Sequence, residues 1–440
     1  MKRIVICLDG TWNQVLDPDT VTNVVKLAQA VRAVASDNIE QVVYYNSGVG
    51  TGDLPDKFLG GVFGRGLKNN VKRAYAFLCL NYVPGDEIYF FGFSRGAYTA
   101  RALAGVIDAS GILRKEHYEK FEIAWNFYRV PPRIRSVLRG HDCKDLIRNI
   151  GASLAEKARA VRQRLRICPP RAMVEYLDFA AQDKIHLEAK IRCVGVWDTV
   201  GSYGIPTGIG LGALGRIFTA WLLRGFHSTE IGKHVEIGLH AVAIDEKRRP
   251  FAPTFWTIAK GQRPVAHVEQ VWFVGAHANV GGGYRDTGLS DLALVWMIAR
   301  TTEIGREKFQ SALEFDPEFV CRHAHPSPFG MLYQSERWWL FSRIWPYVRP
   351  ILPPNAIQVR AILWNGENKH EERINEMVHW SVMQRLGQST PVHGAGDVVY
   401  RPANVEQAAV TPDRVTQRTQ YVCYADACEG VPLALRHYRE

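Results

Sequence analysis

The fold is decided by the stretch EIYFFGFSRGAYTARAL, residues 87–103. Its first seven residues form an apolar and aromatic run of strand length, and the residues from Arg95 onward carry apolar side chains at helical spacing. Between the two lies Gly92-Phe93-Ser94-Arg95-Gly96, a GxSxG sequence. In a strand-to-helix turn, small flanking glycines relieve crowding around the serine, and the helix amino terminus favours developing negative charge. This context predicts a nucleophile at Ser94, whereas the same five residues in isolation would indicate an incidental glycine-rich turn.

Similar patterns recur on both sides of this stretch. Short runs rich in Val, Ile, Tyr and Phe predict buried strands, and apolar residues at three- and four-residue spacing predict helices. The predicted strands are 3–8, 41–45, 87–93, 191–197 and 268–274, and the predicted helices are 23–35, 66–80 and 95–107. Since strands and helices alternate, we expect an α/β fold with a doubly wound, mostly parallel sheet.

Length and composition suit a folded protein with a large core. The chain has 440 residues, of which 47% are hydrophobic and 22% charged, which argues against disordered, collagen-like and coiled-coil classes. The alternation breaks down at 111–190, a helix-prone stretch, and again at 301–440, where prolines interrupt the pattern. We predict a core built from 1–110 and 191–300, a basic, lid-like helical insertion at 111–190, and an irregular C-terminal extension at 301–440 packed on the core.

Positive charge is concentrated in the insertion. Lys and Arg number 54 against 44 Asp and Glu, which gives a formal net charge of +10. Residues 133–171 hold eleven Lys or Arg against three acids, a local net charge of +8. Such an excess favours anionic surfaces, so this segment is a candidate for binding anionic lipid or nucleic acid, with a solvated helical surface as the default explanation.

Cysteine usage and the apolar segments bound the compartment. The eight cysteines are spread too thinly for a disulfide framework or a CxxC zinc site, so we expect reduced, mostly buried thiols. The first apolar run begins at Ile4 and is too short for a Sec-type signal peptide. Segment 205–226 carries two arginines and five glycines, which fits a loop and helix better than a membrane span. We expect no transmembrane helix and a protein that is cytoplasmic as synthesised, with a signal-independent route of secretion left open.

A nucleophilic serine needs a histidine base and an acid that orients it, in the chain order Ser, Asp or Glu, His. Asp198 follows the strand 191–197, at the edge where parallel sheets build their sites, although a capping role in a turn is the alternative. His277 follows another apolar run and precedes the glycines 281–283, which let the backbone turn tightly. These two residues are the predicted acid and base.

Other candidates for these roles stay open at the level of sequence. Asp245 and Asp286 are alternative acids, because a triad is defined by spatial roles rather than by position. His277 is the best placed of the fourteen histidines, and we expect the others, His240 among them, to be ordinary surface or core residues.

An oxyanion hole needs backbone N–H groups, one from the residue after the nucleophile and one from a neighbouring loop. Arg95 supplies the first of these. Gly10 or Thr11, which follow the first strand, are the candidates for the second, with a helix-capping turn as the equal alternative.

Three further patterns bear on other functions. The sequence Leu8-Asp9-Gly10-Thr11 resembles the DxDGT of aspartyl-phosphate phosphatases, but their nucleophilic aspartate would fall at Cys7. The glycine-rich segments 48–52 and 60–66 lack a phosphate-loop pattern and are predicted to be active-site loops. Segment 337–347 interleaves aromatic rings with arginines, which suits either a membrane interface or a partly buried packing strip.

Four motifs together resemble one family. They are Leu8-Asp9-Gly10-Thr11-Trp12-Asn13, Gly92-Phe93-Ser94-Arg95-Gly96-Ala97, Val196-Trp197-Asp198-Thr199-Val200-Gly201 and Gly275-Ala276-His277-Ala278-Asn279-Val280-Gly281-Gly282-Gly283-Tyr284. In this order they are similar to a bacterial and fungal family of uncharacterised α/β hydrolases that includes the catalytic domain of type VI secretion lipase effectors. The resemblance covers about residues 1–300.

The resemblance implies an α/β-hydrolase fold, with Ser94 as nucleophile, Asp198 as acid and His277 as base. It also implies an ester substrate, and phospholipids are the substrates of the effector branch. The family usually has an aspartate two residues after the histidine, where this chain has Asn279. If that position orients a catalytic group, activity is altered; if it only caps the glycine turn, asparagine serves equally well.

The sequence thus predicts a serine hydrolase that cleaves carboxylic esters, as a lipid esterase or phospholipase, with no metal or organic cofactor. The expected partners are the ester or phospholipid substrate and, peripherally, anionic membrane; nucleic acid is not expected and the oligomeric state stays open. One alternative is an esterase or thioesterase for a soluble substrate. Another is a catalytically silent hydrolase scaffold that binds anionic membrane or nucleic acid through 133–171.

Overall fold

The structure is a computed structural model, and it describes the fold of most of the chain. The described residues are 1–10, 20–48, 60–130, 135, 171–200, 230–248, 251–259, 264, 266–334, 348–351, 357–362, 368–408 and 410–417. The predicted segments 205–226 and 337–347, Thr11 and most of 133–171 lie outside these residues.

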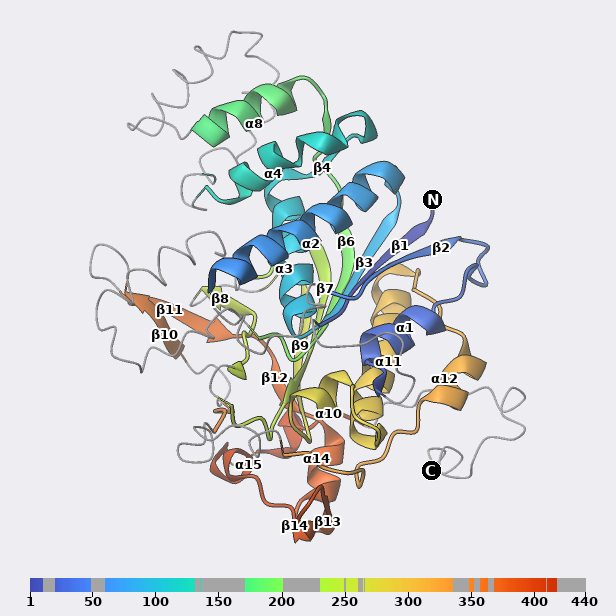
Figure 1. The fold of residues 1–440 in the computed structure, drawn as a ribbon, viewed down its shortest axis with the longest axis vertical. Helices are drawn as coiled ribbons and strands as arrows, with labels where there is room; N and C mark the ends of the chain where they lie inside the picture. The colour runs from blue at the N-terminus through green and yellow to red at the C-terminus, as the bar shows by residue number, and fades with distance from the viewer. Residues whose placement is uncertain are drawn as a thin grey trace.

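A seven-stranded sheet forms the centre of the molecule (Figure 1). Its order is β12 (Glu376–Val378), β9 (His267–Phe273), β7 (Val235–Ala243), β6 (Ile191–Trp197), β3 (Glu87–Phe93), β1 (Arg3–Leu8) and β2 (Gln41–Asn46). All neighbouring strands of this sheet run parallel, so the carboxyl ends meet at one edge. The order reverses between β1 and β3, and ligands of open α/β sheets bind outside the carboxyl ends at such a point.

Helices cover both faces of the sheet, as the doubly wound prediction requires. The helices α2 (Gly60–Asn81) and α3 (Arg95–Ser110) pack on one face, and α1 (Asn23–Ala30) and α11 (Gly288–Phe309) pack on the other. Side chains alternate along a strand, so β1 sends Ile4 and Ile6 to the first core and Val5 and Cys7 to the second. The predicted α/β fold is confirmed.

Three details of the prediction were wrong. Residues 60–66 are the first turns of α2 and not a loop. His240 lies in β7, a central strand that the sequence did not predict, because Glu236, Gly238 and His240 itself interrupt its apolar run. Cys321 is disulfide-bonded, whereas Cys7, Cys79 and Cys193 are free and buried as expected.

The described part of the insertion is helical and packs beside α2 and α3. It comprises β4 (Ile112–Leu113), η2 (Lys115–Lys120), α4 (Phe121–Tyr128), α8 (Arg171–Ala181) and β5 (Ile185–His186). Phe127 of α4 stacks on Tyr176 of α8 with ring centroids 3.8 Å apart. The lid-like role and the domain boundaries stay predictions.

The described residues beyond 310 form a series of short elements. They are α12 (Pro317–His323), β10 (Ile357–Ile362), β11 (Asn368–Arg373), β12, α14 (Trp380–Arg385), β13 (Ser389–Val392), β14 (Gly396–Val399), α15 (Ala403–Ala408) and η6 (Pro412–Arg414). With β8 (Thr257–Ala259), β10 and β11 form a second, antiparallel sheet. Through β12 the C-terminal region also supplies an edge strand of the main sheet, beside the strand that precedes His277.

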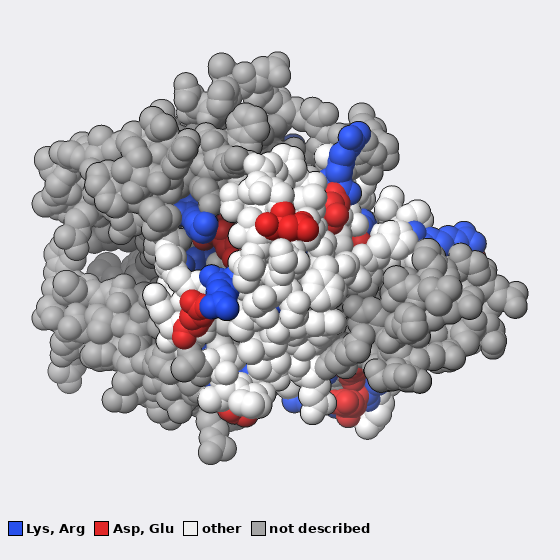
Figure 2. All heavy atoms as spheres, turned by 90° about the horizontal axis from the view of Figure 1, so that it is seen from below, with Lys and Arg blue, Asp and Glu red and all other residues white. Residues whose placement is uncertain are grey.

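The end of the molecule that carries α14, β13 and β14 is seen face-on in Figure 2. The centre of its described surface is largely uncharged, with the Lys, Arg, Asp and Glu side chains scattered around it. Val398 and Val399 of β14 are about half exposed. In the part of the chain that the structure describes, no helix is both long and apolar enough to cross a bilayer.

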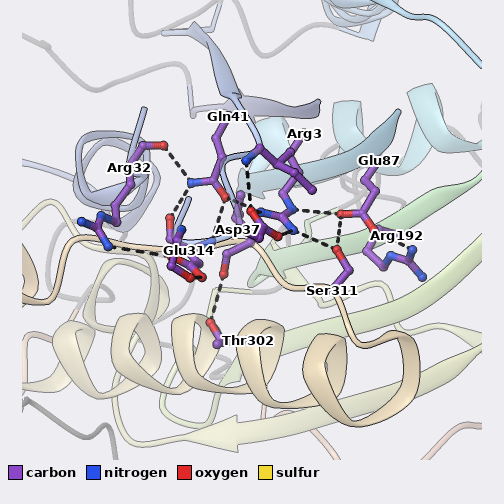
Figure 3. A network of polar contacts seen from close by, with 12 residues as sticks. Arg3, Arg32, Asp37, Gln41, Glu87, Arg192, Thr302, Ser311 and Glu314 are labelled. Carbon is purple, nitrogen blue, oxygen red and sulfur yellow. Dashed lines mark hydrogen bonds and ion pairs between the residues drawn. The ribbon is translucent and has the colours of Figure 1, made fainter. Parts of the chain in front are cut away.

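At the amino ends of the strands lies a partly buried polar cluster, drawn in Figure 3. Its central members, which we call the amino-end cluster, are Arg3, Asp37, Glu87, Arg192 and Ser311. The fully buried Arg3 donates to Glu87 at 3.0 Å, and Arg192 donates to the same carboxylate at 2.7 Å. This cluster ties β1, β3 and β6 together at the end of the sheet opposite to the glycine-rich turns.

Candidate active site

Ser94 occupies a strained turn between β3 and α3. Its backbone angles are φ +57° and ψ −118°, a conformation that a residue with a side chain adopts only under constraint. Gly96 lets the turn pack closely against β1, because a Cβ on it would lie 2.0 Å from the Leu8 carbonyl oxygen at the end of that strand. A Cβ on Gly92 would lie 2.7 Å from the Gly96 carbonyl. The two glycines of the GxSxG sequence are therefore needed where the elbow meets β1 and closes on itself.

His277 begins α10 (His277–Gly281), directly beyond the end of β9. Its Nε2 lies 2.7 Å from Ser94 Oγ. Phe93 and Phe251 pack against the imidazole, with ring centroids 4.6 and 5.0 Å from it. Burial lowers the pKa of His277 more than the neighbouring Asp198 carboxylate raises it, so the ring is neutral at neutral pH. A neutral imidazole beside a hydroxyl is the state that a general base requires.

Asp198 follows β6 and is fully buried. Its Oδ2 lies 2.6 Å from His277 Nδ1, and its Oδ1 accepts the Ala243 N–H at 3.1 Å. Burial by itself raises the pKa of the carboxyl, but the Arg349 guanidinium and His277 outweigh it and hold that pKa well below its usual range. The acid is therefore ionised throughout the range in which the histidine titrates.

Sheet order explains why these three residues meet. The strands β3, β6, β7 and β9 are consecutive neighbours, and Ser94, Asp198 and His277 follow three of them at the same edge. The Ser94 N–H donates to the Trp197 carbonyl at 3.1 Å, which ties the elbow to the end of β6. The structure thus brings together the predicted nucleophile, acid and base.

The two alternative acids lie elsewhere. Asp245 accepts the Gly275 N–H at 2.7 Å and the Tyr400 hydroxyl at 2.9 Å, so it fixes the turn that leads to His277. Asp286 accepts the Gly288 N–H at 3.1 Å, at the start of α11. The carboxylate that contacts His277 Nδ1 is that of Asp198.

His240 and Glu246 accept hydrogen bonds from backbone N–H groups of the site. His240 is buried in β7, and its Nε2 accepts the N–H of Thr199, the residue after the acid, at 3.2 Å. Burial lowers the pKa of His240 to about 3, so it is a neutral core residue. Glu246 accepts the His277 N–H at 3.3 Å and pairs with Arg248. It lies just after β7 at the carboxyl edge, and sequence reasoning missed it because that strand was not predicted.

The candidate donors to an oxyanion hole differ in whether their N–H groups already have a partner. The Arg95 N–H belongs to the first turn of α3, where backbone amides have no partner within the helix. The Gly10 N–H donates to Asp9 Oδ1 at 2.7 Å, and Asp9 also accepts from the Thr22 and Tyr45 hydroxyls. The Gly10 amide is thus already engaged in this structure, and Thr11 lies outside the described residues.

Asn279 faces the turn and not the imidazole. Its Oδ1 accepts the N–H groups of Ala276 and Tyr333 at 3.3 and 3.1 Å, and its Nδ2 donates to the Met331 carbonyl at 3.1 Å. These contacts join the helix of His277 to the chain near residue 332. The role of this position in catalysis stays a prediction.

Sequence reasoning missed Arg349 entirely. This residue of the C-terminal region is fully buried, and both of its terminal nitrogens donate to the Asp198 carboxylate. No local motif marks it, and it lies 151 residues from Asp198 along the chain. Among the described residues, no group of three or more His, Cys, Asp or Glu side chains is placed to hold a metal ion.

A serine, a histidine and an aspartate linked by hydrogen bonds at the carboxyl edge of a doubly wound sheet are typical of α/β hydrolases. Comparison with known sequences specifies the group further. The chain belongs to the family of the T6SS phospholipase effector Tle1-like catalytic domain, whose sequence model matches residues 2–300.

The individual relatives have low sequence identity to this chain. Uncharacterized protein YEL023C of Saccharomyces cerevisiae is 29% identical over 270 residues, which are 58% of this chain and 33% of that protein. An uncharacterized protein from Pseudomonas aeruginosa aligns with a TM-score of 0.37 and 18% identity, over 72% of this chain and 47% of its own. The Tle1 effector, solved bound to the VgrG spike of the type 6 secretion system, aligns with a TM-score of 0.28 and 17% identity, over 65% and 52%. The chain therefore spans a third to about half of these relatives.

Proposed function

We propose that this protein is a serine hydrolase that cleaves carboxylic esters of lipids, with phospholipids as the substrate class. One observation carries the proposal: the hydrogen-bonded series from Ser94 Oγ through His277 to Asp198, with lengths of 2.7 and 2.6 Å, which starts on a strained strand-to-helix turn. Membership of the Tle1-like family supports the lipid substrate.

In the first half of the reaction, Ser94 Oγ attacks the acyl carbonyl while His277 Nε2 takes the hydroxyl proton. Asp198 stabilises the imidazolium that forms and keeps Nδ1 protonated, so that Nε2 is the basic nitrogen. The Arg95 N–H at the amino end of α3 contributes to holding the oxyanion of the tetrahedral intermediate. When the intermediate collapses, His277 returns the proton to the departing alcohol and the acyl group stays on Ser94.

In the second half, a water molecule replaces the alcohol. His277 takes a proton from the water, whose oxygen attacks the acyl-enzyme carbonyl, and a second tetrahedral intermediate forms. Its collapse breaks the bond to Ser94, which recovers its proton from His277, and the fatty acid leaves. Burial of the imidazole among Phe93 and Phe251 keeps it neutral between turnovers.

Covalent labelling with a fluorophosphonate tests the activated serine without knowledge of the substrate. We expect the wild-type chain to label, and Ser94→Ala and His277→Ala to lose labelling. Ser110→Ala is the matched control, because Ser110 ends the same helix and its hydroxyl donates to the Val106 carbonyl. No labelling of folded wild-type protein would contradict serine catalysis.

A panel of phospholipid vesicles and short soluble esters tests the substrate class. A rate that rises sharply when the lipid aggregates supports a lipid esterase. Equal rates on soluble and aggregated esters would favour a hydrolase for soluble substrates.

A further inference from the structure

The catalytic acid of the proposed triad has a fully buried cationic partner. Arg349 Nη1 donates to Asp198 Oδ1 at 2.7 Å, and Nη2 donates to Oδ2 at 3.0 Å. Two carbonyls complete its surroundings, since Nη1 also donates to Ala243 at 2.7 Å and Nη2 to Phe251 at 2.5 Å. A two-pronged contact of this kind fixes the plane of a carboxylate as well as its position.

Each oxygen of Asp198 is shared between Arg349 and a second donor. Oδ1 accepts from Arg349 and from the Ala243 N–H, and Oδ2 accepts from Arg349 and faces His277 Nδ1. Rotation of the carboxylate toward the imidazole would break the contacts with Arg349. The guanidinium therefore decides which oxygen faces the histidine, and at what angle.

Arg349 comes from a part of the chain beyond residues 2–300, the segment that defines the family. The short segment that carries it is anchored on the core by Asn404 of α15, whose Nδ2 donates to the carbonyls of Arg349 at 3.2 Å and Ile244 at 3.1 Å. Ile244 directly follows β7, the strand between those that lead to Asp198 and His277. The C-terminal region is thus fixed to the core at the position from which Arg349 reaches the acid.

We propose that Arg349 is a positioning residue of the hydrolase, which clamps the Asp198 carboxylate in the plane that serves His277 and offsets its negative charge. The C-terminal region then completes the catalytic site and does more than cover the core. This inference rests on the proposed Ser94, His277 and Asp198 mechanism, because Arg349 acts only through Asp198.

Charge compensation gives the inference a readout that a structural role lacks. Without Arg349, the unbalanced carboxylate would favour the imidazolium form of His277, and Asp198 itself would protonate more easily. Both effects remove the active form at a higher pH than in the wild type. We expect the acid limb of the rate-against-pH profile to move upward by about one pH unit.

Arg385 offers a matched control. It is a fully buried arginine of the same C-terminal region, and it donates to the carbonyls of Pro328, Gly330 and Pro391 at 2.9, 2.8 and 3.3 Å. None of these groups belongs to the proposed triad. Loss of Arg385 removes a buried cation from the C-terminal region without touching Asp198.

The experiment measures the rate constant of fluorophosphonate inactivation against pH for the full-length wild type, Arg349→Met, Arg349→Lys and Arg385→Met, with thermal melting of each. For Arg349→Met we expect a ~10- to 100-fold slower inactivation, because the acid is misplaced, together with the upward shift of the acid limb. Arg349→Lys keeps the charge but loses the fork, so its rate falls while its acid limb stays near the wild type. Arg385→Met melts at a lower temperature with an unchanged pH profile.

The outcomes separate this inference from the function on which it rests. If the wild type does not label, the proposed serine hydrolase function is wrong. A wild type that labels, beside a folded Arg349→Met with the same rate and the same acid limb, overturns the role of Arg349 alone. If Arg349→Met does not fold, Arg349→Lys decides: a slower rate at an unshifted limb supports the clamp, and the wild-type rate rejects it.

Discussion

Two buried ionic clusters lie at opposite ends of the same sheet. The amino-end cluster joins Arg3 and Arg192 to Glu87, at 3.0 and 2.7 Å. At the carboxyl edge, Arg349 grips Asp198 at 2.7 and 3.0 Å. In both places an arginine with no exposed surface balances a carboxylate that follows or begins a central strand.

The difference lies in what the carboxylate touches next. The side chain of Glu87 also accepts the Ser311 and Tyr89 hydroxyls, so its contacts end on groups that hold the sheet. Asp198 instead contacts His277, which contacts a serine on a strained turn. A buried ion pair is thus no sign of chemistry by itself, and the proposed chemistry begins where the pair is extended by a titratable ring and a constrained hydroxyl.

Removal of the proposed nucleophile has the largest expected effect at the carboxyl edge. Ser94→Ala should lower ester turnover by about 10⁵- to 10⁶-fold, because the acyl-enzyme cannot form. Its melting temperature should match or exceed that of the wild type, since alanine loses only the contact with His277. Turnover measurements on purified protein check this, and residual activity above a thousandth of the wild type would contradict it.

Neutralisation of the proposed acid, Asp198, has the next largest expected effect. Asp198→Asn should lower the catalytic rate constant by about 10⁴-fold, because the amide cannot hold His277 in the tautomer with a basic Nε2. It also leaves the buried Arg349 without its counter-ion, so the melting temperature should fall as well. Asp245→Asn is the control, and its smaller loss of rate would separate the two aspartates. A greater loss in Asp245→Asn would reassign the acid.

The amino-end cluster should affect stability and not chemistry. Arg3→Met removes the partner of Asp37 and one of the two arginine partners of Glu87, which keeps Arg192, and should lower the free energy of unfolding by about 1 to 3 kcal/mol. Urea unfolding measures that loss. The folded fraction should label with fluorophosphonate at the wild-type rate, and a slower rate would show that the two ends of the sheet are coupled.

The pH dependence of the wild-type activity reports the ionisation of His277 at the carboxyl edge. Because burial lowers the pKa of His277 below its ordinary value near 6.5, the basic form persists to lower pH. The ratio kcat/KM should therefore rise with pH through a midpoint below 6.5 and stay level at neutral pH. A midpoint above 7 would mean that the Asp198 charge outweighs burial.

The smallest effect is expected at Asn279. Asn279→Asp introduces the residue that the family usually has, but it removes the donor to the Met331 carbonyl, so stability should fall by about 1 kcal/mol. Because the side chain faces the turn and not the imidazole, labelling should change by less than about threefold. A large gain in labelling would show that this position orients the catalytic base.

Much of the core could be predicted from the sequence. The strands 3–8, 87–93 and 191–197 have the predicted bounds, because a strand buried on both faces is apolar over most of its length. The strand β7 was missed because polar residues and a glycine interrupt its run. The edge strand β12 was missed because three residues carry no periodicity, and only pairing with β9 makes them a strand.

Some residues of the candidate site could likewise be predicted from the sequence, and others could not. Ser94, Asp198 and His277 were predicted because each follows an apolar strand, and because glycines flank Ser94 and follow His277. Glu246 was not found, because the strand that precedes it, β7, was itself missed. Arg349 was not found either, because its partner lies 151 residues away and no periodicity links the two.

The sequence by itself determined the α/β class, the elbow at Ser94 and the order of the three polar residues, since strand propensity and glycine turns act over a few residues. The tertiary structure decided which aspartate faces His277, which histidine is only core, and which cation balances the acid. Those choices depend on strand order, on the anchoring of the C-terminal region and on the burial of charge, and all three are properties of the assembled chain.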